Sequence, residues 1–242
     1  MSGGSIYQEA LRVLRRLGLP EQAEQDVVAA LEAAQPGPLA LLYEAGVEAG
    51  LRREVLLARG TGIFFNFAAG NLADDLSDGD CTYYMHPLRV GPYVQFLLQN
   101  LAWATLARAG VPAGVMAEAA QALAVAAGPQ ALEVRTLAWT APVFQRVAEG
   151  LAGQQWAAYL RLLWAGTPLA ERSVAGHFLG IAAHVAEDIR SKDPRFFSMP
   201  EADQREVVRW ARAGMDGVRR QGLRCLDAAI RRIDPILPEV VP

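Results

Sequence analysis

The sequence predicts an all-α fold, a bundle of about ten helices around a central apolar cavity. Apolar residues recur at steps of three and four along nearly the whole chain, which is the period of an amphipathic helix. The strict alternation that half-buried strands need is scarce. Glycine and proline recur at intervals that cut the chain into helix-length segments, since both residues favour helix ends.

These breaks define the expected helices in order. The first ends at Gly18 and Pro20, and the second ends before the turn at residues 36–38. Pro142 should kink or split its helix, because proline lacks the N–H donor and clashes with the preceding turn. The segments 54–73 and 174–189 are apolar around most of the helix, so we expect both to be central. The predicted helices cover residues 7–17, 21–34, 39–49, 52–77, 92–109, 112–127, 130–151, 154–164, 169–190 and 200–232.

The composition indicates one globular domain over residues 1–242, because no linker or internal repeat divides the chain. A net charge of −3 argues against nucleic acid as a partner, since phosphate contacts need a basic surface. Two distant cysteines and the absence of a signal peptide favour a reducing, cytoplasmic location. No uncharged apolar run reaches the roughly 18 residues of a transmembrane helix.

An acidic motif ends the long apolar helix over residues 52–77. Asp74, Asp75 and Asp78 lie there, and Asp74 and Asp78 are one helical turn apart. Like charges at this spacing repel, and the C-terminal end of a helix favours cations rather than anions. A bound Mg²⁺ would reverse both penalties, since it prefers carboxylate oxygens. The alternative is a solvated helix end that stops at Gly79.

A second apolar helix ends in Glu187 and Asp188, which we interpret as further metal ligands. His177, His184 and Asp188 share one face of this helix. If the two helices are parallel neighbours, both acidic ends lie at the mouth of one cavity. The expected wall of that cavity comprises Phe64, Phe67, Ala69, Gly70, Phe178 and His184.

An apolar cavity with a metal-binding acidic rim suits an amphiphile that has a hydrocarbon tail and a diphosphate head. The metal would stabilise diphosphate as a leaving group, and aromatic faces would stabilise the cation that forms. On this interpretation Asp74, Asp75 and Asp78 are catalytic. Arg190, Lys192 and Arg53 are the candidates for binding the diphosphate.

Three segments resemble the class I isoprenoid synthases, and most closely a divergent polyprenyl diphosphate synthase. Residues 74–78 match the aspartate-rich motif DDxxD of that family. Residues 128–133 resemble its mid-chain GQ…E segment, and residues 180–189 resemble its GxAFQIxDDIxD segment. The resemblance implies a helical fold, Mg²⁺ as the cofactor, an allylic prenyl diphosphate as the substrate, and a homodimer or a heteromer with an active synthase.

The chain also departs from the family pattern. Glu187 replaces the first aspartate of the second motif, Ser191 replaces its last, and His184 replaces a glutamine. The GGKR-type motif and the Lys-Thr pair of the family are missing. Ionisation followed by cyclisation or elimination needs only one diphosphate site, so it remains open beside prenyl transfer. The alternatives are a non-catalytic partner or regulatory subunit and a helical metal protein that uses His177, His184 and Asp188.

Overall fold

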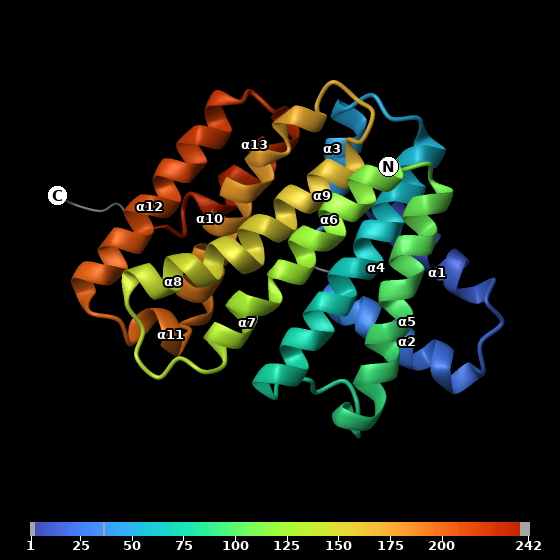
Figure 1. The fold of residues 1–242 in the computed structure, drawn as a ribbon, viewed down its shortest axis with the longest axis horizontal. Coiled ribbons are helices and arrows are strands. Elements are labelled where there is room, and N and C mark those ends of the chain that lie inside the picture. The colour runs from blue at the N-terminus through green and yellow to red at the C-terminus, as the bar shows by residue number, and fades with distance from the viewer. Residues whose placement is uncertain (1–2, 36, 238–242) are drawn as a thin grey trace. The chain divides into compact units, whose positions relative to one another are not determined.

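The computed structural model describes residues 3–35 and 37–237, and within these ranges it contains helices and no β-strand (Figure 1). The all-α prediction is therefore confirmed. The chain divides into two compact units, Met1–Met116 and Ala117–Pro242. The single domain over residues 1–242 stays a prediction. No helix in the described ranges combines the length and the apolar character needed to cross a membrane.

The first unit is built around one long helix. This helix, α4 (Arg53–Asp78), contacts α1, α2, α3 and α5, as its apolar circumference predicts. Ile63, Phe64 and Phe65 in its middle are fully buried. The surrounding helices are α1 (Gly4–Arg15), α2 (Glu21–Ala34), α3 (Leu39–Glu48) and α5 (Pro87–Arg108).

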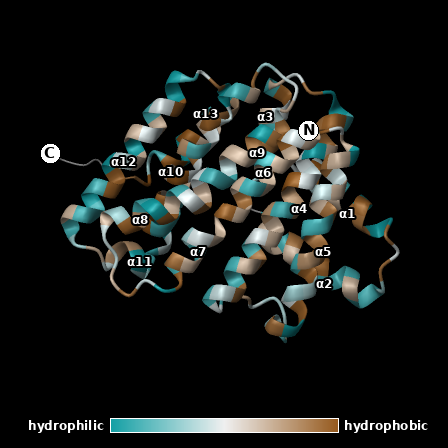
Figure 2. Ribbon diagram, in the orientation of Figure 1, coloured by the Kyte–Doolittle hydropathy of each residue, from teal (hydrophilic) through white to brown (hydrophobic). Residues whose placement is uncertain are grey.

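The second unit repeats this arrangement around α10 (Val174–Ser191). This helix contacts α8, α9, α11, α12 and α13 together with a π-helical turn, η1. The outer helix α12 carries hydrophilic residues along much of its length (Figure 2). The other elements are α6 (Ala113–Val125), α7 (Ala127–Glu133), α8 (Ala141–Ala148), η1 (Glu149–Gly153), α9 (Gln154–Leu163), the 3₁₀ turn η2 (Ala170–Arg172), α11 (Pro194–Phe197), α12 (Glu201–Arg220) and α13 (Arg224–Ile233).

Two glycines set how closely α10 is packed. A Cβ atom at Gly176 would lie 2.6 Å from the carbonyl oxygen of Trp156, and one at Gly180 would lie 2.3 Å from that of Ala152. Both distances are far below van der Waals contact, and a backbone carbonyl cannot rotate away as a side chain can. The spacing of four places both glycines on one face, against α9 and η1.

Helix boundaries differ from the prediction at four places. The predicted helix 169–190 begins only at Val174, after the 3₁₀ turn η2. Helix α5 begins at Pro87, and Pro92 lies inside it, one turn from the start. The predicted helix 130–151 is split, and Pro142 lies in the first turn of α8, where a missing N–H costs nothing. The predicted helix 200–232 is also split, because Gly222 adopts a left-handed conformation (φ 63°) between α12 and α13.

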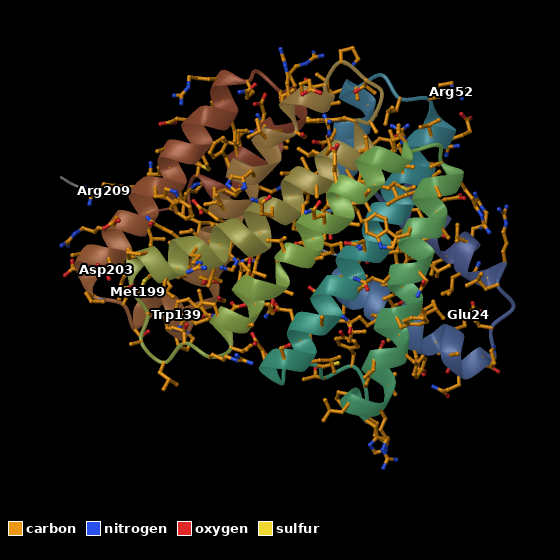
Figure 3. The ribbon with its side chains drawn as sticks, in the orientation of Figure 1. Glu24, Arg52, Trp139, Met199, Asp203 and Arg209 are labelled. Carbon is orange, nitrogen blue, oxygen red and sulfur yellow. The ribbon has the colours of Figure 1, made fainter. Side chains whose placement is uncertain are left out.

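The start of α8 is tied to α12 by one polar contact. The carboxylate of Asp203 accepts a hydrogen bond from the backbone N–H of Ala141 at 3.1 Å. Trp139 and Met199, which are labelled with Asp203 in Figure 3, are both buried. This contact satisfies one backbone donor that α8 leaves without an intrahelical partner.

The packing of α10 yields a first prediction. Gly180→Ala should lower the free energy of unfolding by about 1–3 kcal/mol, because the added methyl meets a backbone carbonyl. Gly114→Ala is the matched control, since nothing lies within 4 Å of a Cβ at that position in α6. It should leave stability equal or slightly raised. Urea unfolding of both variants measures the difference, and equal midpoints would contradict the close packing.

Candidate functional site

The first acidic motif forms the last turn of α4. Gly79 follows it in a left-handed conformation (φ 81°) and ends the helix, one residue beyond the predicted range 52–77. The carbonyl of Asp75 accepts backbone hydrogen bonds from Asp80 (2.8 Å) and Cys81 (3.1 Å). Asp74 and Asp78 are exposed, Asp75 is half-buried, and the last turn of α4 contains no basic residue. The motif is therefore a helix terminus of concentrated negative charge.

Asp75 is held by two neutral donors. Its Oδ2 accepts hydrogen bonds from the hydroxyl of Tyr83 at 2.8 Å and from Nδ2 of Asn71 at 3.0 Å. Burial raises the pKa of Asp75, the Tyr83 hydrogen bond opposes that rise, and Asp80 and Asp78 add to it. The Asp75 carboxylate thus faces the loop that follows α4, and it is less exposed than those of Asp74 and Asp78.

Tyr83 is a residue that the sequence analysis missed. Its ring packs edge-on against Tyr84, with centroids 4.7 Å apart. The Tyr84 hydroxyl donates to the backbone carbonyl of Asp26 in α2. These contacts tie the loop after the motif to both α4 and α2. In the sequence, the pair of adjacent tyrosines in a short polar loop could have indicated that this loop is anchored to the helices.

The first motif suits a hard divalent cation. Asp74 and Asp78 present exposed carboxylates one helical turn apart, and Asp80 follows closely. In the described part of the chain, no three His, Cys, Asp or Glu side chains are grouped as a ready set of metal ligands. Mg²⁺ typically uses only one or two carboxylates and completes its coordination with water and phosphate oxygens. The chemistry of the donors at Asp74 and Asp78 therefore fits this ion.

The second acidic segment has a different geometry. Glu187 is exposed and forms an ion pair with Arg190, one turn further along α10. Asp188 is only 5% exposed, and its Oδ2 has no hydrogen-bond partner. This oxygen lies 4.0 Å from Nε2 of His184, which is too far for a hydrogen bond. Lys192 is exposed and ends α10 in a left-handed conformation (φ 59°).

Burial shifts the pKa values of this pair toward the neutral forms. Burial raises the pKa of Asp188 to about 7, Asp193 adds to the rise, and Arg195 opposes it. Burial also lowers the pKa of His184 to about 4, and Arg195 lowers it further. Near neutral pH the imidazole is therefore uncharged, and the carboxyl of Asp188 is close to its midpoint.

Arg195 lies among several carboxylates and was not assigned to this position by the sequence analysis. Its Nε donates to Oδ1 of Asp193 at 2.9 Å, and its Nη2 donates to Oδ2 of Asp193 at 2.6 Å. Its Nη1 donates to Glu133, which is buried. Although burial lowers the pKa of Arg195, the hydrogen bond to Asp193 and the charge of Glu133 raise it overall.

The predicted pocket wall is distributed over both units. Phe64 is a core residue whose fully buried ring packs edge-on against Tyr7 of α1, with centroids 6.3 Å apart. Phe178 is 37% exposed and lies beside Gly214 of α12. His184 packs against the ring of Phe144, 5.7 Å away. Of the remaining wall residues, Phe67 is half-buried beside Gly37, Ala69 is buried, and Gly70 is exposed.

Arg53 does not belong with the acidic motif. It is the first residue of α4, whereas Asp74 is in the last turns of the same helix. At a rise of 1.5 Å per residue, the two lie about 30 Å apart. A diphosphate held at Asp74 would therefore not reach Arg53, and the role of Arg53 in binding a diphosphate stays a prediction without support from this geometry.

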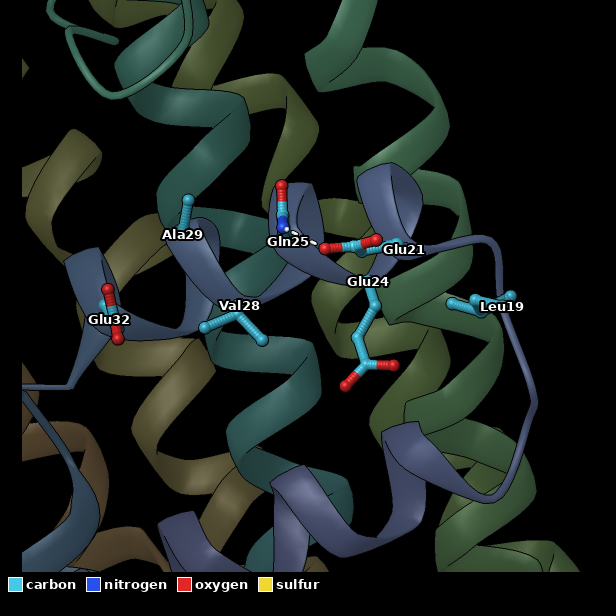
Figure 4. Close-up of a pocket in the computed structure, with 7 residues that line it drawn as sticks. All are labelled: Leu19, Glu21, Glu24, Gln25, Val28, Ala29 and Glu32. Carbon is cyan, nitrogen blue, oxygen red and sulfur yellow. Dashed lines mark hydrogen bonds between the residues drawn. The ribbon is translucent and has the colours of Figure 1, made fainter.

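A separate groove lies on α2, and none of the residues predicted to line the wall is among its lining residues. Its volume is about 480 Å³, and Gln25 in it donates a hydrogen bond to Glu21 at 3.2 Å (Figure 4). The lining residues are Leu19, Glu21, Glu24, Gln25, Val28, Ala29 and Glu32. With three glutamates, this groove does not have the apolar character of the predicted cavity.

Comparison with solved structures identifies the class of fold. A geranyltranstransferase from Thermotoga maritima matches with a TM-score of 0.69 at 16% identity, over 97% of this chain and 98% of that one. A geranyltransferase from Legionella pneumophila matches with a TM-score of 0.72 at 16% identity, over 97% and 95% of the two chains. An FPP/GFPP synthase from Zymomonas mobilis matches with a TM-score of 0.65 at 22% identity, over 96% and 97%.

The chain therefore has the fold of the class I isoprenoid synthases, as its motifs indicated. The low identities agree with a divergent sequence. No protein-family model matches the chain, and no curated protein matches it significantly.

The raised pKa of Asp188 yields a prediction about how the stability of the protein depends on pH. The unfolded chain loses this proton near the ordinary value of 3.8, whereas the native protein keeps it until about 7. Burying Asp188 therefore costs the wild type stability progressively from pH 4 to 7. In metal-free buffer, the stability of Asp188→Asn relative to wild type should rise across this window by at most about 4 kcal/mol, then level off.

His184 changes the pH dependence of stability in the opposite direction to Asp188. The test therefore uses the difference in stability between the variant and the wild type at each pH. Its native pKa of about 4 lies below the ordinary 6.5, so its contribution is lost as the pH falls from 6.5 toward 4. Chemical unfolding at several pH values measures both proteins. The exposed Glu187→Gln is the control and should follow the wild type. A difference between Asp188→Asn and wild type that stays constant from pH 4 to 8 would contradict the assignment.

The loop after α4 yields a third prediction. Tyr83→Phe should lower the free energy of unfolding by about 1–2 kcal/mol, because it removes a hydrogen bond to a half-buried carboxylate. It should also raise the pKa of Asp75 further and speed amide exchange in residues 79–84. Tyr93→Phe is the control, since it removes an exposed hydrogen bond from the tyrosine hydroxyl to Asp26. Equal exchange in the two variants would show that Tyr83 does not hold the loop.

Proposed function

We propose that this chain is a Mg²⁺-dependent enzyme that ionises an allylic prenyl diphosphate. Prenyl transfer, or cyclisation and elimination, would follow. One observation carries the proposal, namely the DDxxD motif at the end of the central apolar helix of a class I isoprenoid synthase fold. The structural neighbours described as geranyltransferases and as an FPP/GFPP synthase support this substrate class.

The proposed roles follow from the contacts of each residue. Asp74 and Asp78 would hold the ion, since both are exposed at the end of α4. A bound Mg²⁺ supplies Lewis-acid stabilisation of the departing diphosphate. Asp75 joins the end of α4 to the following loop through Tyr83, and Asn71, one turn earlier in α4, donates to the same carboxylate oxygen. Removing either donor would loosen the turn that carries Asp74 and Asp78.

Lys192 and Arg190 are the proposed partners of the diphosphate. Lys192 is exposed at the end of α10, and Arg190 is exposed although it pairs with Glu187. A surface pair of this kind contributes little, so Arg190 can exchange Glu187 for a more highly charged anion. The chain lacks the GGKR-type motif for a second diphosphate. This absence favours ionisation with cyclisation or elimination over chain elongation.

Association with a second copy or with an active synthase is part of the proposal. Leu88 and Phe96 of α5 are 79% and 72% exposed, and their spacing of eight residues places them on the same side of the helix. A helix with two such residues suits a protein interface. A cytoplasmic location also stays a prediction.

A non-catalytic subunit is the second candidate. The observation that favours it is the engagement of Arg195 with Asp193 and Glu133, which leaves fewer cations to receive a diphosphate. The third hypothesis, a helical metal protein, gains no support. His177, His184 and Asp188 form no three-residue ligand group in the described ranges.

Activity against a panel of substrates tests the proposal. The purified protein, with Mg²⁺ and allylic diphosphates of 10 to 20 carbons, should release diphosphate. Asp74→Ala should reduce this release by roughly 100-fold or more, as is typical when an electrostatic contact to the transition state is lost. Asp80→Ala is the matched control, because it removes an equal charge just outside the motif.

The outcomes separate the candidates. Release that requires isopentenyl diphosphate indicates chain elongation, and release without it indicates ionisation alone. Equal loss in Asp74→Ala and Asp80→Ala would show that the effect is general to the acidic loop. No release from any substrate by folded protein would favour the non-catalytic subunit.

A further inference from the structure

We propose that Arg195 is the built-in cation of the second acidic segment, and that Glu187 and Asp188 therefore hold no metal ion. The guanidinium would occupy the charge-balancing role that a divalent cation would otherwise have there. This inference deepens the proposed function, and its catalytic consequence rests on that function. If it holds, the first motif alone carries the metal.

The contacts of Arg195 provide the first support. Its Nε and Nη2 engage both carboxylate oxygens of Asp193, and its Nη1 engages the buried Glu133. A two-point pairing between a guanidinium and a carboxylate is the strongest geometry that this pair can adopt. The same Asp193 also caps α11, because its Oδ1 accepts the backbone N–H of Arg195 at 2.7 Å.

The position of Asp193 in the chain explains how this arrangement arises. Ser191 occupies the last position of the helical acidic pattern, and the carboxylate comes two residues later. Because α10 ends at Ser191, Asp193 lies beyond the helix and at the start of α11. The carboxylate of Asp193 therefore lies outside α10 and pairs with Arg195, although its charge still raises the pKa of Asp188.

The remaining carboxylates are poorly placed to bind an ion. Glu187 is exposed and pairs with Arg190. Asp188 is 5% exposed, which leaves no room for the water molecules that Mg²⁺ retains. The charge of Arg195 opposes the rise in the pKa of Asp188, so the guanidinium already acts on the carboxyl with the orphaned oxygen. A metal ion at Asp188 would also be repelled by the guanidinium of Arg195, whose charge already acts on this carboxyl.

Thermal unfolding with and without divalent cations tests the role of Arg195. In EDTA, Arg195→Gln should lower Tm by roughly 6–20 °C, because it breaks a buried ion pair and leaves two carboxylates without their cation. Adding Mg²⁺ or Mn²⁺ should restore part of that loss in Arg195→Gln. Arg190→Gln is the matched control, since its ion pair is exposed. Its Tm in EDTA should fall little, and adding the metal should not raise this Tm more than it raises that of the wild type.

Mn²⁺ binding, followed by electron paramagnetic resonance with inorganic diphosphate present, is the second measurement. Glu187→Gln/Asp188→Asn should bind as many Mn²⁺ ions as the wild type. Asp74→Asn/Asp78→Asn should lose them. Fewer ions bound by the Glu187→Gln/Asp188→Asn protein would overturn the inference, as would wild-type stability in Arg195→Gln without metal.

The two measurements also separate this inference from the proposed function. If the wild type binds no Mn²⁺, the metal-dependent function fails, and the Tm of Arg195→Gln still decides the role of Arg195. If Arg195→Gln does not fold, Arg195→Lys keeps the charge. It should fold with a reduced Tm that does not depend on metal, and metal-dependent folding of this variant would contradict the inference.

Discussion

Each unit of this protein depends on the burial of one long apolar helix. A helix that is apolar around most of its circumference can be stable in water only when other helices surround it. Helix α4 meets this requirement with α1, α2, α3 and α5, and α10 meets it with α8, α9, α11, α12 and α13. The small residues on both helices then decide how closely each neighbour approaches, as at Gly176 and Gly180.

The ends of these two helices solve the same electrostatic problem in different ways. Negative charge at a helix C-terminus is unfavourable because the backbone dipole is also negative there. At the end of α4 the carboxylates of Asp74 and Asp78 stay exposed, where water or a cation can compensate them. At the end of α10 the compensation comes from within the chain, through Arg195 and Arg190. The acidic side chains Asp74 and Asp78 at the end of α4 are exposed, whereas Glu187 and Asp193 near the end of α10 are paired with arginines.

This asymmetry connects the divergent sequence with the proposed chemistry. The chain keeps DDxxD but has a shifted and substituted second motif, within a fold that resembles synthases over almost its whole length. On the proposed function, the exposed acidic terminus of α4 would serve to activate one diphosphate. The absence of the second acidic pattern is the reason why the proposed function favours ionisation of one substrate over condensation of two.

Periodicity and motif spacing in the sequence determined the helical fold, the two central helices, the end of α4 at Gly79 and the acidic position of its last turn. These features depend on residues close together in the chain, so local rules suffice to predict them. The split of the region 200–232 depends on the conformation of Gly222, which local periodicity does not reveal. The pairing of Arg195 with Glu133, the Tyr83 contact to Asp75 and the burial of Asp188 were decided only by tertiary structure. Glu133 and Arg195 are 62 positions apart, and no local pattern specifies which distant charge will neutralise a buried group.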